Sequence, residues 1–90
     1  MHSSDLDDHG AETVLVRYWA GARAAAGVDE ERLPGAATVG DLVTRLAAAH
    51  PALEQVLPVC SVLVAGRASA GTDPLPGGAV VEVLPPFAGG

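Results

Sequence analysis

The last twelve residues, Ala79-Val80-Val81-Glu82-Val83-Leu84-Pro85-Pro86-Phe87-Ala88-Gly89-Gly90, decide how the chain is organised. The first half of this stretch is rich in valine and predicts a final strand. Two prolines then end the ladder, because each lacks a backbone N–H and holds φ near −65°. We therefore expect residues 85–90 to leave the sheet as an extended arm that spans at most roughly 20 Å. Glycine has no Cβ, so a narrow channel can close around Gly89 and Gly90 and leave the last carbonyl open to attack.

Length and composition predict one small domain. The chain has 90 residues, which fits a single compact core. Residues 1–12 are polar and acidic, and we expect them to form a disordered N-terminal extension. Residues 13–84 would form the domain, and residues 85–90 the extended tail that ends in Gly-Gly.

Charge and cysteine content exclude several classes of function. The formal net charge is −6, which argues against nucleic acid as a partner and favours docking on basic protein surfaces. A single cysteine, Cys60, allows neither an internal disulfide nor a cysteine-based zinc cluster. His2 and His9 have no further ligands at suitable spacing, so we expect no metal. Because no stretch resembles a membrane span or a signal peptide, we expect a cytoplasmic protein without a membrane partner.

Periodicity predicts strands alternating with helices. The strands are expected at 13–19, 28–33 (an edge strand), 61–65 and 79–84, and the helices at 20–27, 38–50 and, shorter, 51–57. Helix 38–50 carries the clearest pattern, with Thr38 as its N-cap, Pro51 after its end and one apolar stripe: Val39, Leu42, Val43, Leu46 and Ala47. Residues 67–78 read as a turn-rich connector. The order predicts an α+β fold in which one main helix packs on one face of a mixed sheet of four or five strands.

The first and last strands can pair at the centre of this sheet. Its face away from the helix would then present Leu15, Arg17, Trp19, Val80, Glu82 and Leu84. A mixture of Trp, Leu and Arg is typical of interface centres, so we place Trp19 on a binding surface rather than in the core. Cys60 is interpreted as a small buried hydrophobe and not a nucleophile. His50 is interpreted as a favourable charge at a helix end or a solvated residue.

Three stretches together resemble a known family. They are Trp19-Ala20-Gly21-Ala22-Arg23 through Gly27, Thr38-Val39-Gly40-Asp41-Leu42, and Asp73-Pro74-Leu75-Pro76-Gly77-Gly78 through the Pro85-Pro86-Phe87-Ala88-Gly89-Gly90 ending. They are similar to the small subunit of molybdopterin synthase, MoaD, within the ubiquitin-like β-grasp sulfur carriers that include ThiS. The resemblance runs from about Val14 to Gly90. The acidic extension lies outside the family pattern, and alanines replace larger residues in the first helix and the connector.

The resemblance implies a sulfur-transfer mechanism. An E1-like (MoeB-like) enzyme would use ATP to adenylate Gly90, and sulfur from a persulfide donor would replace AMP to leave a thiocarboxylate. The large, MoaE-like subunit would receive the tail, supply the acid–base groups and build molybdopterin from cyclic pyranopterin monophosphate. Gly89 and Gly90 carry over as the reactive tail. By the same resemblance Trp19, Arg23 and Leu84 contact partners, together with the tail residues Pro85, Pro86, Phe87 and Ala88. No cofactor is expected to stay bound.

Three alternatives remain open at this stage. The chain could be a sulfur carrier for thiazole or cysteine synthesis, a ubiquitin-like modifier joined to lysines through Gly90, or a β-grasp interaction module with an inert tail. The Pro-Pro exit favours molybdopterin synthase. Fold alone does not decide among them.

Overall fold

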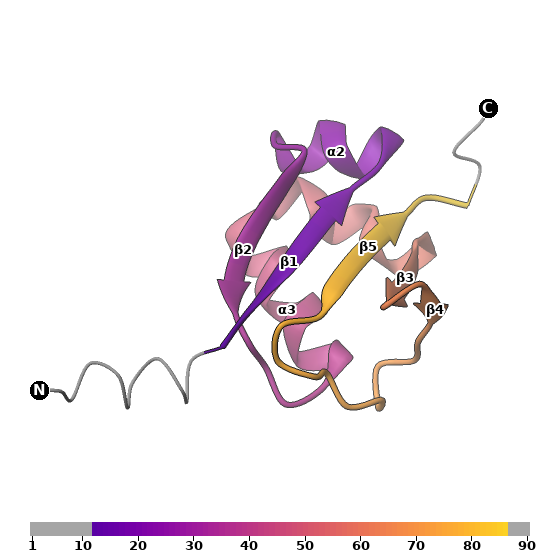
Figure 1. The fold of residues 1–90 in the computed structure, drawn as a ribbon. Helices are drawn as coiled ribbons and strands as arrows, with labels where there is room; N and C mark the ends of the chain where they lie inside the picture. The colour runs from indigo at the N-terminus through magenta and orange to yellow at the C-terminus, as the bar shows by residue number, and fades with distance from the viewer. Residues whose placement is uncertain (1–11, 87–90) are drawn as a thin grey trace, which may run out of the picture.

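The computed structural model of the chain describes residues 12–86, so residues 1–11 and 87–90 are outside the description that follows. The elements run in the order β1 (Thr13–Tyr18), α2 (Ala20–Ala26), β2 (Glu30–Pro34), α3 (Val39–Ala49), the 3₁₀ helices η1 (Pro51–Gln55) and η2 (Leu57–Val59), β3 (Ser61–Val64), β4 (Arg67–Ala68) and β5 (Val80–Leu84). Figure 1 shows them as one sheet with the helices behind it. The α+β prediction is therefore confirmed.

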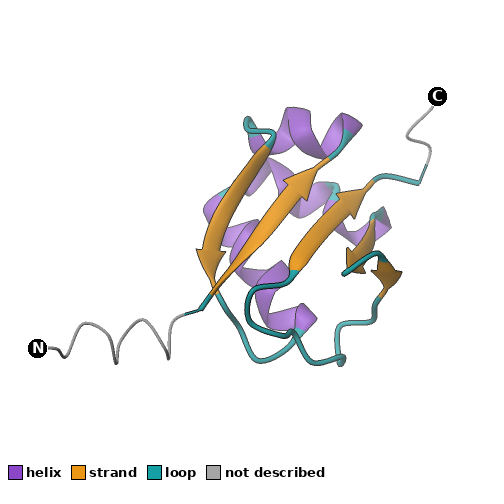
Figure 2. Cartoon of the chain, viewed as in Figure 1, coloured by secondary structure: helices purple, strands orange, loops and turns teal. Residues whose placement is uncertain are grey.

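The sheet has five strands in the order β2-β1-β5-β3-β4. β1 and β5 run parallel at its centre, with Tyr18 opposite Val83, and the other pairs are antiparallel. The prediction of a mixed sheet with the first and last strands side by side is confirmed. The long helix α3 lies behind the sheet, and among the described residues no helix covers the face turned toward the viewer in Figure 2.

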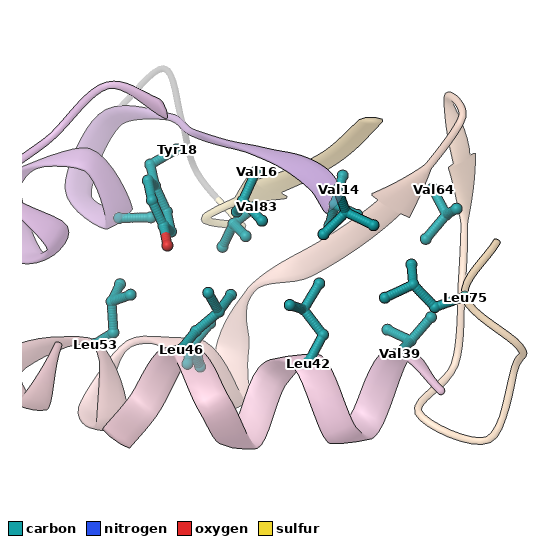
Figure 3. Close-up of a cluster of buried hydrophobic side chains, with 13 residues drawn as sticks. Val14, Val16, Tyr18, Val39, Leu42, Leu46, Leu53, Val64, Leu75 and Val83 are labelled. Carbon is teal, nitrogen blue, oxygen red and sulfur yellow. The ribbon is translucent and has the colours of Figure 1, made fainter. Parts of the chain in front are cut away.

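The core lies between α3 and the rear face of the sheet. Leu42 and Leu46 are fully buried and point toward the sheet (Figure 3), and Leu53 from η1 extends the same layer. The sheet contributes alternate residues of β1 and β5: Val14, Val16, Tyr18, Val81 and Val83. Each fully buried leucine contributes about 1.5–3 kcal/mol relative to an exposed one. The alternation in β1 and β5 fixes which side chains remain on the opposite face.

The backbone N–H groups in the first turn of α3 donate hydrogen bonds to other residues of this chain. The Asp41 N–H donates to Oγ1 of Thr38 at 3.1 Å, as the predicted N-cap requires. The N–H groups of Val39 and Gly40 donate to the carbonyl oxygens of Asp73 at 3.0 Å and Gly71 at 2.8 Å. A Cβ on Gly40 would lie 3.0 Å from that Gly71 oxygen, so any larger residue at this position would crowd the connector. These N–H groups are therefore not available to bind an anion.

Helix α2 begins and ends at residues with positive φ. Ala20 has a φ of 49°, unusual for a residue with a Cβ. Gly27 ends the helix with a φ of 80°, and its N–H donates to the Arg23 carbonyl at 2.9 Å. The predicted helix 20–27 and its glycine C-cap are confirmed. The strained entry at Ala20 was not expected.

Two details of the sheet differ from the prediction. The edge strand begins at Glu30 and reaches Pro34, whereas 28–33 was expected. The short strand β4 lies inside the expected connector, because Ala65 and Gly66 both adopt positive φ (52° and 80°) and turn the chain back on β3. Two successive residues of positive φ are typical of a tight hairpin turn, for which Asn-Gly is the usual sequence signal. Ala-Gly does not carry that signal.

His50 is not simply solvated. Its Nε2 lies 2.6 Å from Oε2 of Glu31, and both side chains are only about one-fifth exposed (19% and 23%). The Tyr18 hydroxyl donates to the same oxygen at 2.6 Å, and the Tyr18 and His50 rings meet edge to face. The solvated interpretation of His50 is therefore wrong: the residue joins the end of α3 to β2 and β1.

Neither a metal cluster nor a membrane helix occurs in the described part of the chain. Within residues 12–86, no three His, Cys, Asp or Glu side chains are grouped so that they could hold a metal ion. Over the same residues, no helix is long and apolar enough to cross a bilayer. The predicted disorder of residues 1–12 and the predicted extended tail fall almost wholly outside the described range and stay predictions.

Candidate partner surface and tail exit

The tail leaves the sheet beside Trp19. Because β1 and β5 are parallel, both end at the same edge, where Figure 1 shows α2 and the start of the C-terminal segment. The Trp19 N–H donates to the Val83 carbonyl at 3.1 Å, so the backbone bonding of β1 to β5 continues one residue beyond the strand. Trp19 is itself extended, with φ of −118° and ψ of 146°. Its side chain therefore continues the alternation of β1 and faces away from the core.

The face opposite α3 carries the six side chains predicted for it. Leu15, Arg17 and Trp19 alternate with the buried residues of β1, and Val80, Glu82 and Leu84 alternate with those of β5. We call these six residues the sheet-face patch. Trp19 is 44% exposed and Val80 39%, and Leu84 is partly buried. An uncovered tryptophan beside partly exposed aliphatic side chains has the composition of an interface centre.

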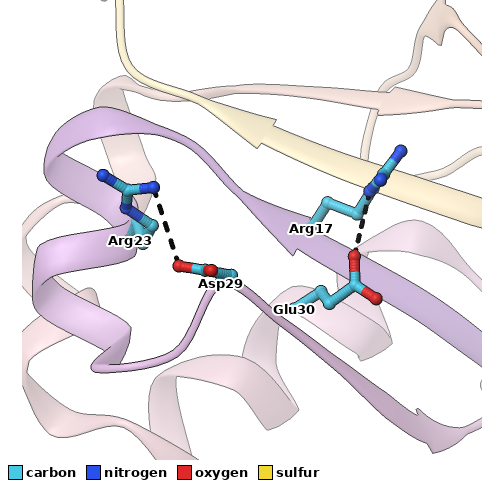
Figure 4. Close-up of polar contacts among 4 residues, drawn as sticks. All are labelled: Arg17, Arg23, Asp29 and Glu30. Carbon is cyan, nitrogen blue, oxygen red and sulfur yellow. Dashed lines mark hydrogen bonds and ion pairs between the residues drawn. The ribbon is translucent and has the colours of Figure 1, made fainter.

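Charged side chains lie around this apolar centre. Nε of Arg17 lies 3.1 Å from Oε1 of Glu30 on β2, and Nη1 of Arg23 on α2 lies 3.6 Å from Oδ1 of Asp29 (Figure 4). All four side chains are about half exposed or more, so each pair contributes little to stability, about 0–1 kcal/mol. A binding partner can therefore break these two ion pairs and form ion pairs with its own charged side chains at little cost in free energy.

Most of the predicted partner residues are placed by the structure. Trp19, Arg23 and Leu84 lie at the tail end of the sheet, with Pro85 partly buried and Pro86 exposed directly after β5. Phe87, Ala88, Gly89 and Gly90 lie outside the described residues, so their predicted roles stay predictions. The exposure of Trp19 confirms that it belongs to the surface and not to the core.

Leu63 was missed as a member of this surface. β3 pairs with β5 on the side away from β1, with Leu63 opposite Glu82 and Ser61 opposite Leu84. Val64 is buried on the core side, so Leu63 faces the same way as the sheet-face patch. The alternation in Ser61-Val62-Leu63-Val64 indicates that Leu63 and Val64 face opposite sides of the sheet. It does not indicate that β3 is the neighbour of β5.

The described residues offer little chemistry of their own. A hollow of about 450 Å³ lies between α3 and β3, lined in part by Cys60, Ser61 and Ser69. Cys60 is partly buried, and burial raises the pKa of its thiol. A thiol with a raised pKa is a poor nucleophile near neutral pH. A second groove of about 630 Å³, between α3 and the 3₁₀ helices, has Glu54 as the one ionisable residue among its lining.

Comparison with known protein families matches residues 16–90 to the ThiS family. The chain belongs to the ThiS/MoaD family. The match includes β1 from Val16 onward, all later elements and the Gly-Gly end of this ThiS-family protein.

Solved structures support the fold of the ThiS-family chain. A Pyrococcus furiosus protein described as a putative molybdopterin converting factor, subunit 1, is 32% identical with a TM-score of 0.76, over 84% of this chain and 99% of that one. Small archaeal modifier protein 1 (SAMP1) from Haloferax volcanii is 30% identical with the same TM-score, over 87% and 99%. These similarities identify the five-stranded sheet and its helices as the ubiquitin-like β-grasp fold.

A more distant structure contains two subunits. It is a complex of subunits 1 and 2 of the molybdopterin-converting factor from Helicobacter pylori, with 23% identity and a TM-score of 0.65, over 87% of the ThiS-family chain and 99% of that one. At this identity it supports the fold alone. A search of curated protein sequences found no match.

Proposed function

We propose that this protein is a cytoplasmic sulfur carrier and the small subunit of a molybdopterin synthase. The observation that carries the proposal is the position of Pro85 and Pro86. They follow β5 directly, and the exposed Trp19 follows β1, the strand paired with β5. A partner that covers the sheet-face patch would receive the tail at the edge of its contact. Membership of the ThiS/MoaD family supports the same reading.

Loading of the tail needs an activating partner. A carboxylate is a poor electrophile, so an E1-like enzyme would join the Gly90 carboxylate to AMP from ATP and release pyrophosphate. A persulfide sulfur on a donor protein would then attack the acyl carbon, and AMP would leave. Cleavage of the sulfur–sulfur bond by a second thiol would leave the thiocarboxylate on Gly90. ATP is consumed by the partner and is not held by this chain.

Unloading would take place inside the large subunit. The thiocarboxylate of Gly90 would supply sulfur to cyclic pyranopterin monophosphate, and the large subunit would supply the acid and base groups. This chain contributes position: the sheet-face patch fixes the domain, and the prolines aim the glycines into the partner. Holding a reactive sulfur beside its substrate can account for much of a rate enhancement.

A ubiquitin-like modifier is the second candidate. Small archaeal modifier protein 1 from Haloferax volcanii matches at 30% and 28% identity in two structures. In that role the activated Gly90 would form an amide with a lysine of another protein. Sulfur carriers of thiazole or cysteine synthesis share the same activation and differ in the enzyme that consumes the sulfur.

Intact-mass measurement tests the carrier role. The purified protein is incubated with ATP, an E1-like enzyme and a persulfide donor, and its mass should rise by the difference between sulfur and oxygen. A chain lacking Gly90 is the matched control: it should gain no sulfur while keeping the thermal stability of the intact protein. An unchanged mass of the intact chain would count against every carrier role.

Addition of the large subunit separates the candidates. The loaded protein, mixed with a MoaE-like subunit and the pyranopterin precursor, should yield molybdopterin. Amide adducts on lysines of other proteins, without molybdopterin, would favour the modifier instead.

A further inference from the structure

The sequence contains no lysine. All five basic residues are arginines: Arg17, Arg23, Arg32, Arg45 and Arg67. The two side chains carry the same charge but differ in chemistry, because a lysine amine loses its proton often enough to act as a nucleophile, whereas a guanidinium stays protonated and delocalised. No side chain of this protein can therefore form an amide with an activated carboxyl group.

The other strong nucleophiles of the described residues are buried or engaged. The thiol of Cys60 lies partly buried at the wall of the hollow between α3 and β3. The Tyr18 hydroxyl is buried and donates to Glu31, and Nε2 of His50 lies 2.6 Å from the same carboxylate oxygen. Serine and threonine hydroxyls are weak nucleophiles without an adjacent base. His2 and His9 lie outside the described residues, and an acylated imidazole forms only a transient intermediate.

We propose that this protein acts only as a donor: no side chain of one copy captures the activated Gly90 acyl group of another. The inference rests on the proposed activation of Gly90. In the reaction avoided, an amine nitrogen attacks the acyl carbon, the bond from carbon to the AMP oxygen breaks, AMP leaves with the electron pair, and the nitrogen loses a proton to solvent. Activated copies then cannot be joined to one another through a side-chain amine. If the protein also modifies other proteins, no second copy is attached through a side chain of the first.

The positions of the arginines show where a lysine can be tested. Nη1 of Arg45 donates to the carbonyl oxygens of Pro34 at 2.6 Å and Gly35 at 3.3 Å, so that residue supports the fold. Arg67 on β4 and Arg32 on β2 are exposed and lie on opposite edges of the sheet. Arg67→Lys and Arg32→Lys each keep the charge and add one amine. The wild-type protein is the matched control for both.

The experiment uses the full chain with an E1-like enzyme and ATP, without a sulfur donor, at mildly alkaline pH. Hydroxylamine in a parallel sample should convert Gly90 to a hydroxamate, which shows that the acyl group is activated. Intact masses then report covalent dimers, and fragment masses locate each link. We expect no side-chain link in the wild-type protein. In Arg67→Lys and Arg32→Lys we expect dimers joined by an amide through the introduced amine.

The outcomes separate this inference from the function on which it rests. Side-chain links in the wild-type protein would overturn the donor-only proposal while leaving activation intact. Hydroxamate formation without dimers in both variants would overturn it too, because lysine would then not be the missing acceptor. Absence of the hydroxamate would refute the activation of Gly90, and with it both proposals.

Discussion

The backbone N–H of Trp19 donates to the carbonyl oxygen of Val83 at 3.1 Å. This bond joins the residue after β1 to the end of β5, one residue before Leu84 and two before Pro85. It places a 44% exposed indole at the edge from which the tail departs. The candidate recognition residue and the candidate reactive segment are thus coupled by the central pair of strands.

Replacing Trp19 or Leu84 should impair partner binding more than folding. Each side chain faces away from the core, and large apolar residues at the centre of an interface commonly contribute more than about 1.4 kcal/mol, or tenfold in affinity. We expect Trp19→Ala to weaken binding of the large subunit about tenfold or more, as measured by calorimetry. Its thermal midpoint should shift by only a few degrees, roughly 1 kcal/mol or less.

Thr44→Ala provides the matched surface control. Thr44 is exposed on α3, on the layer opposite the sheet-face patch, and should leave affinity unchanged. If Trp19→Ala lowered stability and affinity in parallel, the indole would belong to the folding core instead of the partner surface.

Ala20→Gly should stabilise the protein. Ala20 has a φ of 49°, where a Cβ crowds the backbone at a cost of about 1–2 kcal/mol. Glycine removes that crowding but makes the unfolded chain more flexible, so the net gain should be about 0.5 kcal/mol or more. Urea unfolding measures it.

Ala24→Gly is the control within the same helix. Ala24 lies in the middle of α2 with its side chain exposed to solvent. Glycine at this position should lower the free energy of unfolding by about 1 kcal/mol. Equal losses in both variants would show that the positive φ of Ala20 carries no strain.

Tyr18, Glu31 and His50 should behave as one energetic unit. Two groups meet Oε2 of Glu31 at 2.6 Å in a partly buried site. Tyr18→Phe removes one hydrogen-bond donor from that carboxylate. The free energy of unfolding should fall by about 1–3 kcal/mol. A double-mutant cycle with His50→Ala should give a coupling energy of about 0.5 kcal/mol or more. Strict additivity in urea unfolding would argue against a shared network.

The same tyrosine should make stability fall in alkali. Burial, and then the neighbouring Glu31 carboxylate, raise the pKa of Tyr18 well above its ordinary value of 10.0. The unfolded chain therefore loses the phenol proton at a lower pH than the folded protein does. Tyr18 thus contributes its full stabilisation below pH 10.0, and this stabilisation declines as the pH rises above 10.0. The free energy of unfolding of the wild-type protein should decline more steeply there than that of Tyr18→Phe. Parallel pH profiles would contradict the assignment.

Cys60 should react slowly with alkylating reagents. Burial raises the pKa of its thiol, so less thiolate is present near neutral pH than in the unfolded chain. Mass spectrometry after iodoacetamide treatment should show slower labelling of the folded protein than of protein in urea, with the difference shrinking as the pH rises. Equal rates in both states would mean that the thiol is freely exposed.

Much of the fold was readable from local patterns. The stripe from Val39 to Ala47, with Thr38 before it and Pro51 after it, predicted α3 because a 3.6-residue period and the capping chemistry are local properties. The alternation in β1 and β5 predicted which side chains would be buried. The Pro85-Pro86 break marked the end of the last strand by the same logic, since proline cannot continue a ladder.

The tertiary structure decided what lies beside what. Strand order placed β3 next to β5 and so brought Leu63 to the same face as Leu84. Packing of α3 on the sheet brought His50 to Glu31, 19 residues away in sequence, and turned an apparently solvated histidine into part of a partly buried contact. The turn at Ala65-Gly66 formed β4 with an alanine at the position where Asn, Asp or Gly is usual. Local sequence specifies periodicity and caps, whereas contacts between distant residues exist only once burial of the whole core has chosen one arrangement of the strands.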